Sequence, residues 1–135
     1  MIRQVYNLSD KMLLDCYYIV SYFMGNAYNF YYSIKDKVNS GRSVMFVHEN
    51  AGCIDGFVTG HIDGHIAHVD NLYIDAKAQG TGVGTALLRT YENYAKAQDV
   101  KNFSLMSRNT ARAIRFYEKQ GYVRLGMSNK MTKSL

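Results

Sequence analysis

The chain contains one glycine-rich segment, residues 79–84 (QGTGVG), which limits the folds that the sequence can adopt. The segment follows a β-branched and apolar stretch that ends at Ile74, and it opens a helical pattern from about Thr81 to Gln98. The apolar residues of that pattern recur at helical spacing: Val83, Leu87, Tyr91, Tyr94 and Ala95. A strand, a glycine turn and an amphipathic helix in this order predict an α/β unit in which the helix packs on a sheet.

The remaining elements follow from residue periodicity and turn residues. We expect strands over residues 2–7, 43–48, 53–62, 65–74 and 101–107, with short ones from 121 and over 128–132. We expect three further helices over residues 10–24, 28–38 and 110–120. Turn residues break the pattern at Gly25-Asn26, at 50–52 and at Asp63-Gly64, which predicts a two-residue hairpin. This order predicts an α/β (α+β) fold, with a mixed central sheet of six to seven strands flanked by about four helices.

The composition is that of a small globular protein. The 135 residues include no proline and no repeat, so we expect one domain over residues 1–135. At 47% apolar residues the chain can bury a core without disulfides or a structural metal. Cys16 and Cys53 lie far apart and lack C-x-x-C spacing, which is typical of thiols in a reducing compartment. The N-terminus lacks a signal-peptide pattern, and the apolar window 13–24 is too short to cross a bilayer, so we expect a cytoplasmic protein with no membrane partner.

The net charge of +5 raises the question of a nucleic-acid partner. The lysines and arginines are scattered, and no three are consecutive, whereas nucleic-acid binding would favour a basic stripe. A modest positive excess also suits a phosphorylated small molecule. We therefore expect no nucleic acid among the partners.

The glycine-rich segment is suited to binding phosphate. The first amides of a helix have no internal acceptor and lie at the positive end of its dipole, and glycines let a phosphate approach them closely. The nucleoside-triphosphate loop requires a lysine that is missing here, and the dinucleotide fingerprint fails because Thr85 stands in place of its third glycine. The pattern Q/R-x-x-G-x-G/A matches in full.

Joined to a second motif, this loop resembles the GNAT superfamily of acyl-CoA N-acetyltransferases. Residues 71–74 (NLYI), the loop and residues 85–88 (TALL) are similar to the central motif of that family. Residues 113–122 (AIRFYEKQGY) are similar to its second motif, and the two motifs cover about half of the chain. The resemblance implies the GNAT fold and a single N-acetyltransferase domain that transfers an acetyl group from acetyl-CoA to an amine in a ternary complex.

The resemblance also implies which residues bind acetyl-CoA. The backbone amides of the loop would hold its pyrophosphate: Gln79, Gly80, Thr81, Gly82, Val83 and Gly84. The backbone of Leu72, Tyr73 and Ile74 would pair with the pantetheine arm as an added strand does. The family often has an asparagine seven residues before its catalytic tyrosine. Here Thr110 holds that offset and Asn109 precedes it, so either residue is a candidate for contacting the cofactor.

Three residues are candidates for catalysis. Tyr117 matches the tyrosine that protonates the departing thiolate in many family members, and an ordinary phenol has a pKa of about 10. Aligned on the loop, His68 takes the place of a glutamate base in some relatives, and Asp70 on the same strand face is the second candidate. Water is the third candidate for the general base. A hairpin at Asp63-Gly64 places His61 and His68 on one face and His65 on the other, too few ligands for zinc, so we expect no metal.

The acceptor is the least constrained part of the prediction. Seven of the twelve tyrosines precede residue 33, and all of them except Tyr6 lie in the first two predicted helices, which usually wall the acceptor site in GNAT proteins. They suit a small-molecule or peptide amine equally well. The alternative function is a non-catalytic module that senses acyl-CoA, and the resemblance leaves a homodimer open.

Overall fold

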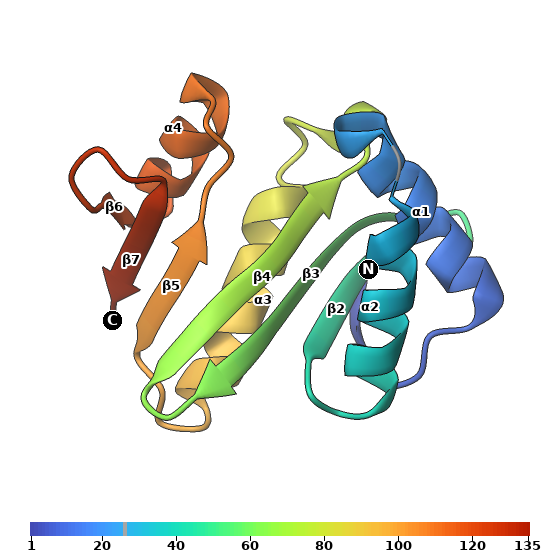
Figure 1. Ribbon diagram of the computed structural model, residues 1–135, viewed down its shortest axis with the longest axis horizontal. Helices are drawn as coiled ribbons and strands as arrows, with labels where there is room; N and C mark the ends of the chain where they lie inside the picture. The colour runs from blue at the N-terminus through green and yellow to red at the C-terminus, as the bar shows by residue number, and fades with distance from the viewer. Residues whose placement is uncertain (26) are drawn as a thin grey trace.

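The computed structural model describes residues 1–25 and 27–135 and shows a central sheet covered by helices on both faces (Figure 1). The strands are β1 (Ile2–Val5), β2 (Val44–Asn50), β3 (Cys53–Asp63), β4 (Ile66–Ile74), β5 (Asn102–Met106), β6 (Val123–Arg124) and β7 (Lys130–Ser134). The helices are α1 (Asp10–Met24), α2 (Tyr28–Asn39), α3 (Val83–Lys96) and α4 (Ala111–Lys119), with a 3-10 turn η1 (Ala76–Ala78) before α3. Within residues 1–25 and 27–135 the sheet has seven strands in the order β1-β2-β3-β4-β5-β7-β6, and only β4 and β5 pair in parallel. The predicted fold class is thereby confirmed.

Most elements begin and end within a few residues of their predicted positions. Ser9 caps α1 by accepting a hydrogen bond from the Met12 amide at 3.2 Å, and the Gly25 amide closes the helix on the Ser21 carbonyl at 2.8 Å. Asn26, the other residue of the predicted break, lies outside the described residues.

Three predicted boundaries were wrong. The hairpin turn consists of Gly64 and His65, because Asp63 still pairs with Ile66 in the ladder. Helix α3 begins at Val83, since Thr81 belongs to the turn before it. The last strand runs from Lys130 to Ser134 rather than over 128–132.

Two separate cores hold the layers together. Helices α1 and α2 cover one face of the sheet, where Leu13, Val20 and Ile34 pack on Met45 and Phe57. Helix α3 covers the opposite face, and the inward side of α4 joins its core, which contains Leu87, Tyr91, Val58, Phe103 and Tyr122. The two aromatic-rich cores fix both helical layers to the strands between them. Among the described residues, no helix is both long and apolar enough to span a bilayer.

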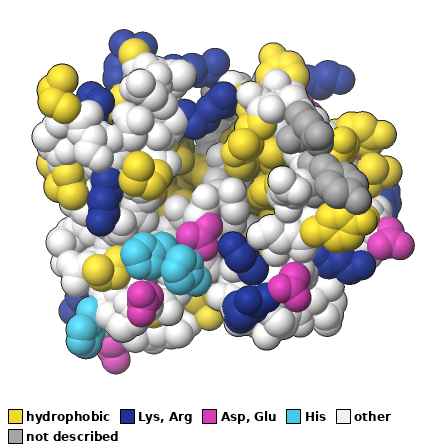
Figure 2. All heavy atoms as spheres, viewed as in Figure 1, with side chains coloured by type: hydrophobic (Ala, Val, Ile, Leu, Met, Phe, Trp, Pro, Cys, Tyr) yellow, Lys and Arg dark blue, Asp and Glu magenta, His cyan; other side chains and the backbone are white. Residues whose placement is uncertain are grey.

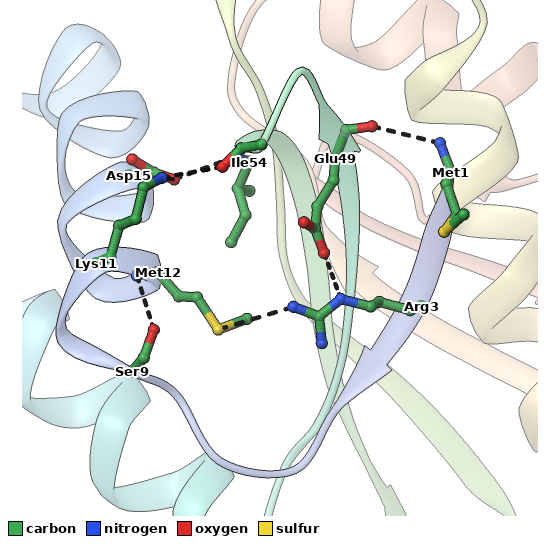
Figure 3. Close-up of polar contacts among 9 residues, drawn as sticks. Met1, Arg3, Ser9, Lys11, Met12, Asp15, Glu49 and Ile54 are labelled. Carbon is green, nitrogen blue, oxygen red and sulfur yellow. Dashed lines mark hydrogen bonds and ion pairs between the residues drawn. The ribbon is translucent and has the colours of Figure 1, made fainter.

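Polar contacts fix the first half of α1 to the start of β3 (Figure 3). The Asp15 carboxylate accepts a hydrogen bond from the Ile54 amide at 3.1 Å and pairs with Lys11 one helical turn earlier at 3.2 Å. On the neighbouring strands, Arg3 forms an ion pair with Glu49. The Asp15–Ile54 hydrogen bond holds α1 against β3, and at the other end of the helix Phe23 packs on Tyr73 near the end of β4.

The β3–β4 ladder contains a bulge. Gly60 pairs with Val69 and Thr59 pairs with Asn71, which leaves Asp70 as the extra residue of β4. Gly60 is required here because a Cβ would lie 2.4 Å from the Tyr91 ring and 2.3 Å from the His68 carbonyl oxygen. The Tyr91 hydroxyl fills this space and donates to the His68 carbonyl at 2.7 Å. Tyr91 of α3 can therefore pack against the bulge only because residue 60 is a glycine.

Strands β4 and β5 separate beyond this point. They pair only from Ile66 with Asn102 to Val69 with Leu105, whereas β4 continues to Ile74. The part of β4 after Val69 therefore has no strand on its β5 side among the described residues (Figure 1). The sheet is therefore split beside residues 72–74, whose backbone the resemblance implies would pair with a pantetheine arm.

Candidate active site

A cleft of about 710 Å³ occupies the split between β4 and β5. Its walls are the second half of β4, the glycine turn, the end of β5 and the inward side of α4. Figure 2 shows the face that carries α1 and α2, which is hollowed between the parts of the molecule that hold α4 and α1 and has lysine and arginine side chains at the edge of the hollow. The residues predicted from sequence that line the cleft are Asp70, Leu72, Tyr73, Ile74, Gln79, Gly80, Gly82, Gly84, Thr110 and Tyr117.

The glycine turn presents open amides to the cleft. Gly80 and Gly82 have φ angles of 77° and 89°, a left-handed conformation that favours glycine. Gly82 is the N-cap of α3, and Ala86 is the first residue whose amide bonds back to it, at 3.0 Å. The amides of residues 83–85 therefore have no acceptor within the described part of the chain. An anion at this end of α3 would meet several donors and the positive end of the helix dipole.

Two predicted loop residues face away from the cleft. The Thr81 hydroxyl hydrogen-bonds to the Ala78 carbonyl and holds the turn closed. The Val83 side chain packs in the core beneath α3. The side chains of both residues thus shape the turn, and only their backbones remain candidates for binding.

The outer half of β4 supplies an open backbone edge. The side chains of Leu72 and Ile74 pack into the core under α3, while the Tyr73 ring packs on the α1–α2 side against Phe23, with ring centroids 5.8 Å apart. The Tyr73 hydroxyl donates to the Met24 sulfur at 3.0 Å. With both faces packed, the backbone edge toward β5 is the surface that an extended ligand arm could pair with.

Tyr117 lies on the α4 wall of the cleft. Its ring makes edge contacts with Phe116 at 5.1 Å and Tyr122 at 5.9 Å, and its hydroxyl hydrogen-bonds to no described residue. Burial, with a smaller contribution from the nearby Tyr73, raises the pKa of Tyr117 to about 12. The expectation of an ordinary phenol is therefore wrong, since this hydroxyl stays protonated through the physiological range and is available as a hydrogen-bond donor.

The candidate bases form one cluster on the α1–α2 face. The Asp70 carboxylate is 2.7 Å from Nδ1 of His61, and the rings of His61 and His68 stack with centroids 4.7 Å apart. Figure 2 shows two histidine side chains touching an acidic one on this face. Asp70 lines the cleft, whereas His68 lies outside the lining and contacts Asp70's partner instead. The geometry thus favours Asp70, the second candidate in the sequence, over His68.

Thr110 and Asn109, at the start of α4, differ in whether they line the cleft. Thr110 lines the cleft and also caps α4, because its hydroxyl accepts a hydrogen bond from the Ala113 amide at 3.2 Å. Asn109 does not line the cleft. Of the two alternatives for the cofactor contact, only Thr110 is among the described residues that line the cleft.

Several cleft residues escaped the sequence analysis. Phe23 reaches the cleft from α1, and Arg108, Arg112, Lys119 and Gln120 reach it from the end of β5 and from α4. No local motif marks Phe23 or Arg108, which are brought together over 85 residues of chain. The expected tyrosines of the N-terminal third are missing from the described lining, and the side chain of Tyr28 lies outside the description. Within the described residues, no three His, Cys, Asp or Glu side chains gather as a metal site would require.

Comparison with solved structures defines the class of this fold. The chain superposes on an N-acetyltransferase of Thermoplasma acidophilum, called PaiA and solved with coenzyme A, with a TM-score of 0.73 and 18% identity over 100% of this chain and 99% of that one. It superposes on an aminoglycoside 6′-acetyltransferase of type Ii with a TM-score of 0.84 and 13% identity, covering 99% and 96% of the two chains. At such identities the likeness establishes the fold.

Sequence comparison establishes the family. The profile of the Acetyltransferase (GNAT) family matches residues 6–122, so the chain belongs to the GNAT acetyltransferase family. An uncharacterized N-acetyltransferase of Methanocaldococcus jannaschii is 32% identical over 80 residues, which are 58% of this chain and 51% of that protein. The chain thus spans about half the length of this curated relative.

Proposed function

We propose that this protein transfers an acetyl group from acetyl-CoA to a primary amine by direct attack in a ternary complex. Membership of the GNAT family supports acyl transfer in general. The observation that supports this particular reaction is the cleft through the sheet, which joins the open amides of the glycine turn to the Asp70 carboxylate. Tyr117 lies in the same cleft, where a leaving thiolate would need a donor.

The donor would bind along the glycine turn and the open edge of β4. Its pyrophosphate would accept hydrogen bonds from the amides of residues 83–85, and Arg112 and Lys119 on the neighbouring α4 would add positive charge. Its pantetheine arm would pair with the backbone of residues 70–74, beyond the last β5 partner. The thioester then reaches the split in the sheet.

Asp70 is the proposed base. An amine with a pKa of about 10 is protonated at neutral pH, and making it neutral costs about 4 kcal/mol. The Asp70 carboxylate would take the proton from the bound ammonium, and the neutral nitrogen would then attack the thioester carbonyl. His61, which hydrogen-bonds to the carboxylate at 2.7 Å, holds it in place and is the first group outside the cleft that can pass the proton to water.

Tyr117 is the proposed donor to the leaving sulfur. The tetrahedral intermediate collapses by breaking the carbon–sulfur bond, and the thiolate needs a hydrogen bond as its charge develops. Because burial raises the pKa of Tyr117 to about 12, its phenol is a weaker acid than an ordinary thiol, whose pKa is about 8.5. Tyr117 would therefore stabilise the thiolate by hydrogen bonding, and the second proton of the amine would complete the thiol.

One assay tests both substrates. A panel of primary amines is incubated with acetyl-CoA, free thiol is followed, and the melting temperature is recorded with acetyl-CoA and with NAD. We expect acetyl-CoA to raise the melting temperature by about 5–10 °C at a hundredfold excess over its Kd, with no change for NAD. We also expect amine-dependent thiol release.

Two outcomes would contradict the proposal. A thermal shift without turnover of any amine would identify a non-catalytic acyl-CoA sensor. A folded sample that does not respond to acetyl-CoA would exclude acyl-CoA as the ligand of the cleft.

A further inference from the structure

Arg108 is the residue of the cleft whose charge the proposed reaction does not use. It follows β5, and its side chain crosses the cleft to the last turn of α1. The guanidinium carbon lies 5.1 Å from the centre of the Phe23 ring, and Nη2 lies 3.5 Å from the Phe23 carbonyl oxygen. The ring holds the guanidinium plane, so the side chain has a defined position at the mouth of the cleft.

No described carboxylate neutralises the charge of Arg108. Two other arginines have carboxylate partners, since Arg3 pairs with Glu49 and Arg42 with Asp36. Among residues 1–25 and 27–135, no Asp or Glu forms an ion pair with Arg108. The Arg108 guanidinium donates a long hydrogen bond of 3.5 Å to the Phe23 carbonyl, which uses one of its five N–H donors. The rest of the guanidinium is free to bind an anion.

The position of Arg108 separates it from the phosphates of the donor. The glycine turn opens α3 and packs against α4, where a Cβ on Gly84 would lie 3.4 Å from the Phe116 ring. This is the side of the sheet that α3 covers. Arg108 contacts Phe23 on the opposite side, where Tyr73 also packs. Arg112 and Lys119 are the cleft cations on the α4 wall, whereas Arg108 lies on the side of the sheet away from the proposed phosphate site.

Among the described residues that line the cleft, Asp70 is the one acidic side chain. Both side chains line the same cleft: Asp70 lies on β4, and Arg108 lies just after the end of β5. The charge of Arg108 also reaches Tyr73, whose pKa it lowers against the larger upward effect of burial. An acceptor at this place therefore meets a carboxylate, a guanidinium, and the rings of Phe23 and Tyr73.

We propose that the acceptor is an amino-carboxylate, a small molecule or chain end that carries a carboxylate near its primary amine. This inference rests on the proposed acetyl transfer and names its substrate class. Asp70 binds the ammonium and takes its proton, while Arg108 binds the carboxylate through its planar pair of N–H donors. Phe23 and Tyr73 contact the carbon skeleton between the two charges. A polyamine would instead bring a second positive charge toward Arg108.

The test compares amines that differ only in the carboxylate. Amino acids with two to six carbons between the amine and the carboxylate are each paired with their neutral amide, which keeps length and shape, and kcat/KM is measured for each at saturating acetyl-CoA. At the best length we expect the acid to exceed the amide by about 10- to 100-fold, as a charge-assisted hydrogen bond provides. Arg108→Met should remove this preference, and Arg108→Lys should restore part of it.

Binding measurements keep the test independent of turnover. The same acid and amide pairs are titrated calorimetrically into protein saturated with CoA, using wild type and Arg108→Met. A preference for acids in wild type that Arg108→Met loses supports the proposal even if no amine is acetylated, which would contradict only the proposed function. The acetyl-CoA thermal shift of Arg108→Met shows whether the variant is folded and able to bind the donor.

Three results would overturn the proposal. Equal affinity and kcat/KM for acids and amides at every length would show that no carboxylate is recognised. An acid preference that persists in Arg108→Met would assign the recognition to another residue. A loss confined to the acetyl-CoA thermal shift and KM would place Arg108 on the donor.

Discussion

The Asp70 carboxylate lies 2.7 Å from Nδ1 of His61, across the β3–β4 ladder and at the residue that the bulge adds to β4. A regular strand would pair Asp70 with a residue of β3. The bulge instead directs it into the cleft while His61, whose ring stacks on His68, holds one of its oxygens. The base and its hydrogen-bond partner are thus products of one local irregularity of the sheet.

The first prediction concerns this pair. Asp70→Asn keeps the size of the side chain but removes the proton acceptor, so kcat/KM for the amine should fall by about 10²- to 10⁴-fold. The acetyl-CoA thermal shift should remain, because the proposed phosphate donors are the amides of residues 83–85 and not the Asp70 side chain. Steady-state kinetics and thermal shift measure the two quantities on one sample.

Two histidine variants serve as controls for Asp70. His61→Gln should cause a smaller loss, since Asp70 keeps its charge and loses only the group that orients it. His65→Gln, in the exposed hairpin turn, should change neither quantity. Wild-type kcat/KM in Asp70→Asn would exclude Asp70 as the base, and a larger effect of His68→Gln would return that role to His68.

The second prediction uses the buried phenol of Tyr117. Tyr117→Phe should lower kcat by about 10- to 100-fold while the KM for the amine changes little, because the hydroxyl acts on the leaving sulfur. Ionisation of Tyr117 should not limit the rate at any pH below about 10. A pH profile of kcat checks both statements, and unchanged kcat in Tyr117→Phe would remove Tyr117 from the mechanism.

The same phenol should make the free energy of unfolding decrease as the pH rises above about 10. Unfolded tyrosine ionises near pH 10, whereas burial raises the pKa of Tyr117 to about 12. The stability due to the neutral phenol is complete below about pH 10 and is lost as the pH rises toward about 12, at up to about 1.4 kcal/mol per pH unit. Urea unfolding across this range should show a shallower decline in Tyr117→Phe than in wild type. Equal slopes would show that Tyr117 is solvated.

The third prediction tests the glycine turn with a matched pair of substitutions. Gly82 is the left-handed N-cap of α3, and a Cβ there meets nothing within 4 Å. Asp and Asn are similar in size, both tolerate this conformation, and both cap helices. Gly82→Asp should abolish the acetyl-CoA thermal shift because its carboxylate lies where the pyrophosphate would bind, whereas Gly82→Asn should retain most of it. Equal shifts in the two variants would contradict a phosphate site at this turn.

The sequence predicted the elements well because each depends on local pattern. β-Rich segments separated by turn residues indicated β2 to β4, and helical patterns over residues 10–24 and 110–120 indicated α1 and α4. The site was predicted less completely, because its parts depend on contacts between distant residues. The bulge at Asp70 requires Tyr91 to pack on Gly60, and this contact has no local signature.

The error of one residue in the hairpin turn has a similar cause. The Asp63-Gly64 pattern is compatible with two registers, and the one adopted places His61 directly opposite His68. Arg108 was missed because its partner, Phe23, lies 85 residues earlier in the chain. In each case the residue type was visible in the sequence, and its neighbour was not.

The fourth prediction concerns a buried ion pair that joins α3 to β7. Glu92 is 4% exposed, pairs with Lys133 at 3.0 Å and accepts a hydrogen bond from the Tyr122 hydroxyl at 2.8 Å. Lys133→Met leaves the Glu92 carboxylate buried without its cation and should lower the free energy of unfolding by about 3–5 kcal/mol. The double variant Glu92→Leu with Lys133→Met should recover much of this loss. Urea unfolding measures the free energy for both variants, and an unchanged free energy in Lys133→Met would show that the pair is solvated.

The fifth prediction separates the two cysteines. Cys16 is 1% exposed, and burial, with a smaller effect of Asp15, raises the pKa of its thiol to about 12. Cys53 is exposed on β3. Since the thiolate is the reactive form, iodoacetamide at about pH 8 should label Cys53 in the native protein, and Cys16 only after unfolding in guanidinium chloride. Peptide mass spectrometry identifies the labelled residue, and Cys53→Ser is the control that should take up no label while folded. Labelling of Cys16 in the native protein would contradict its burial.

Both cysteines lie outside the cleft lining, so a direct-transfer enzyme should keep its acetyltransferase activity after Cys53 is alkylated. An enzyme that used Cys53 in an acyl-cysteine mechanism would lose that activity.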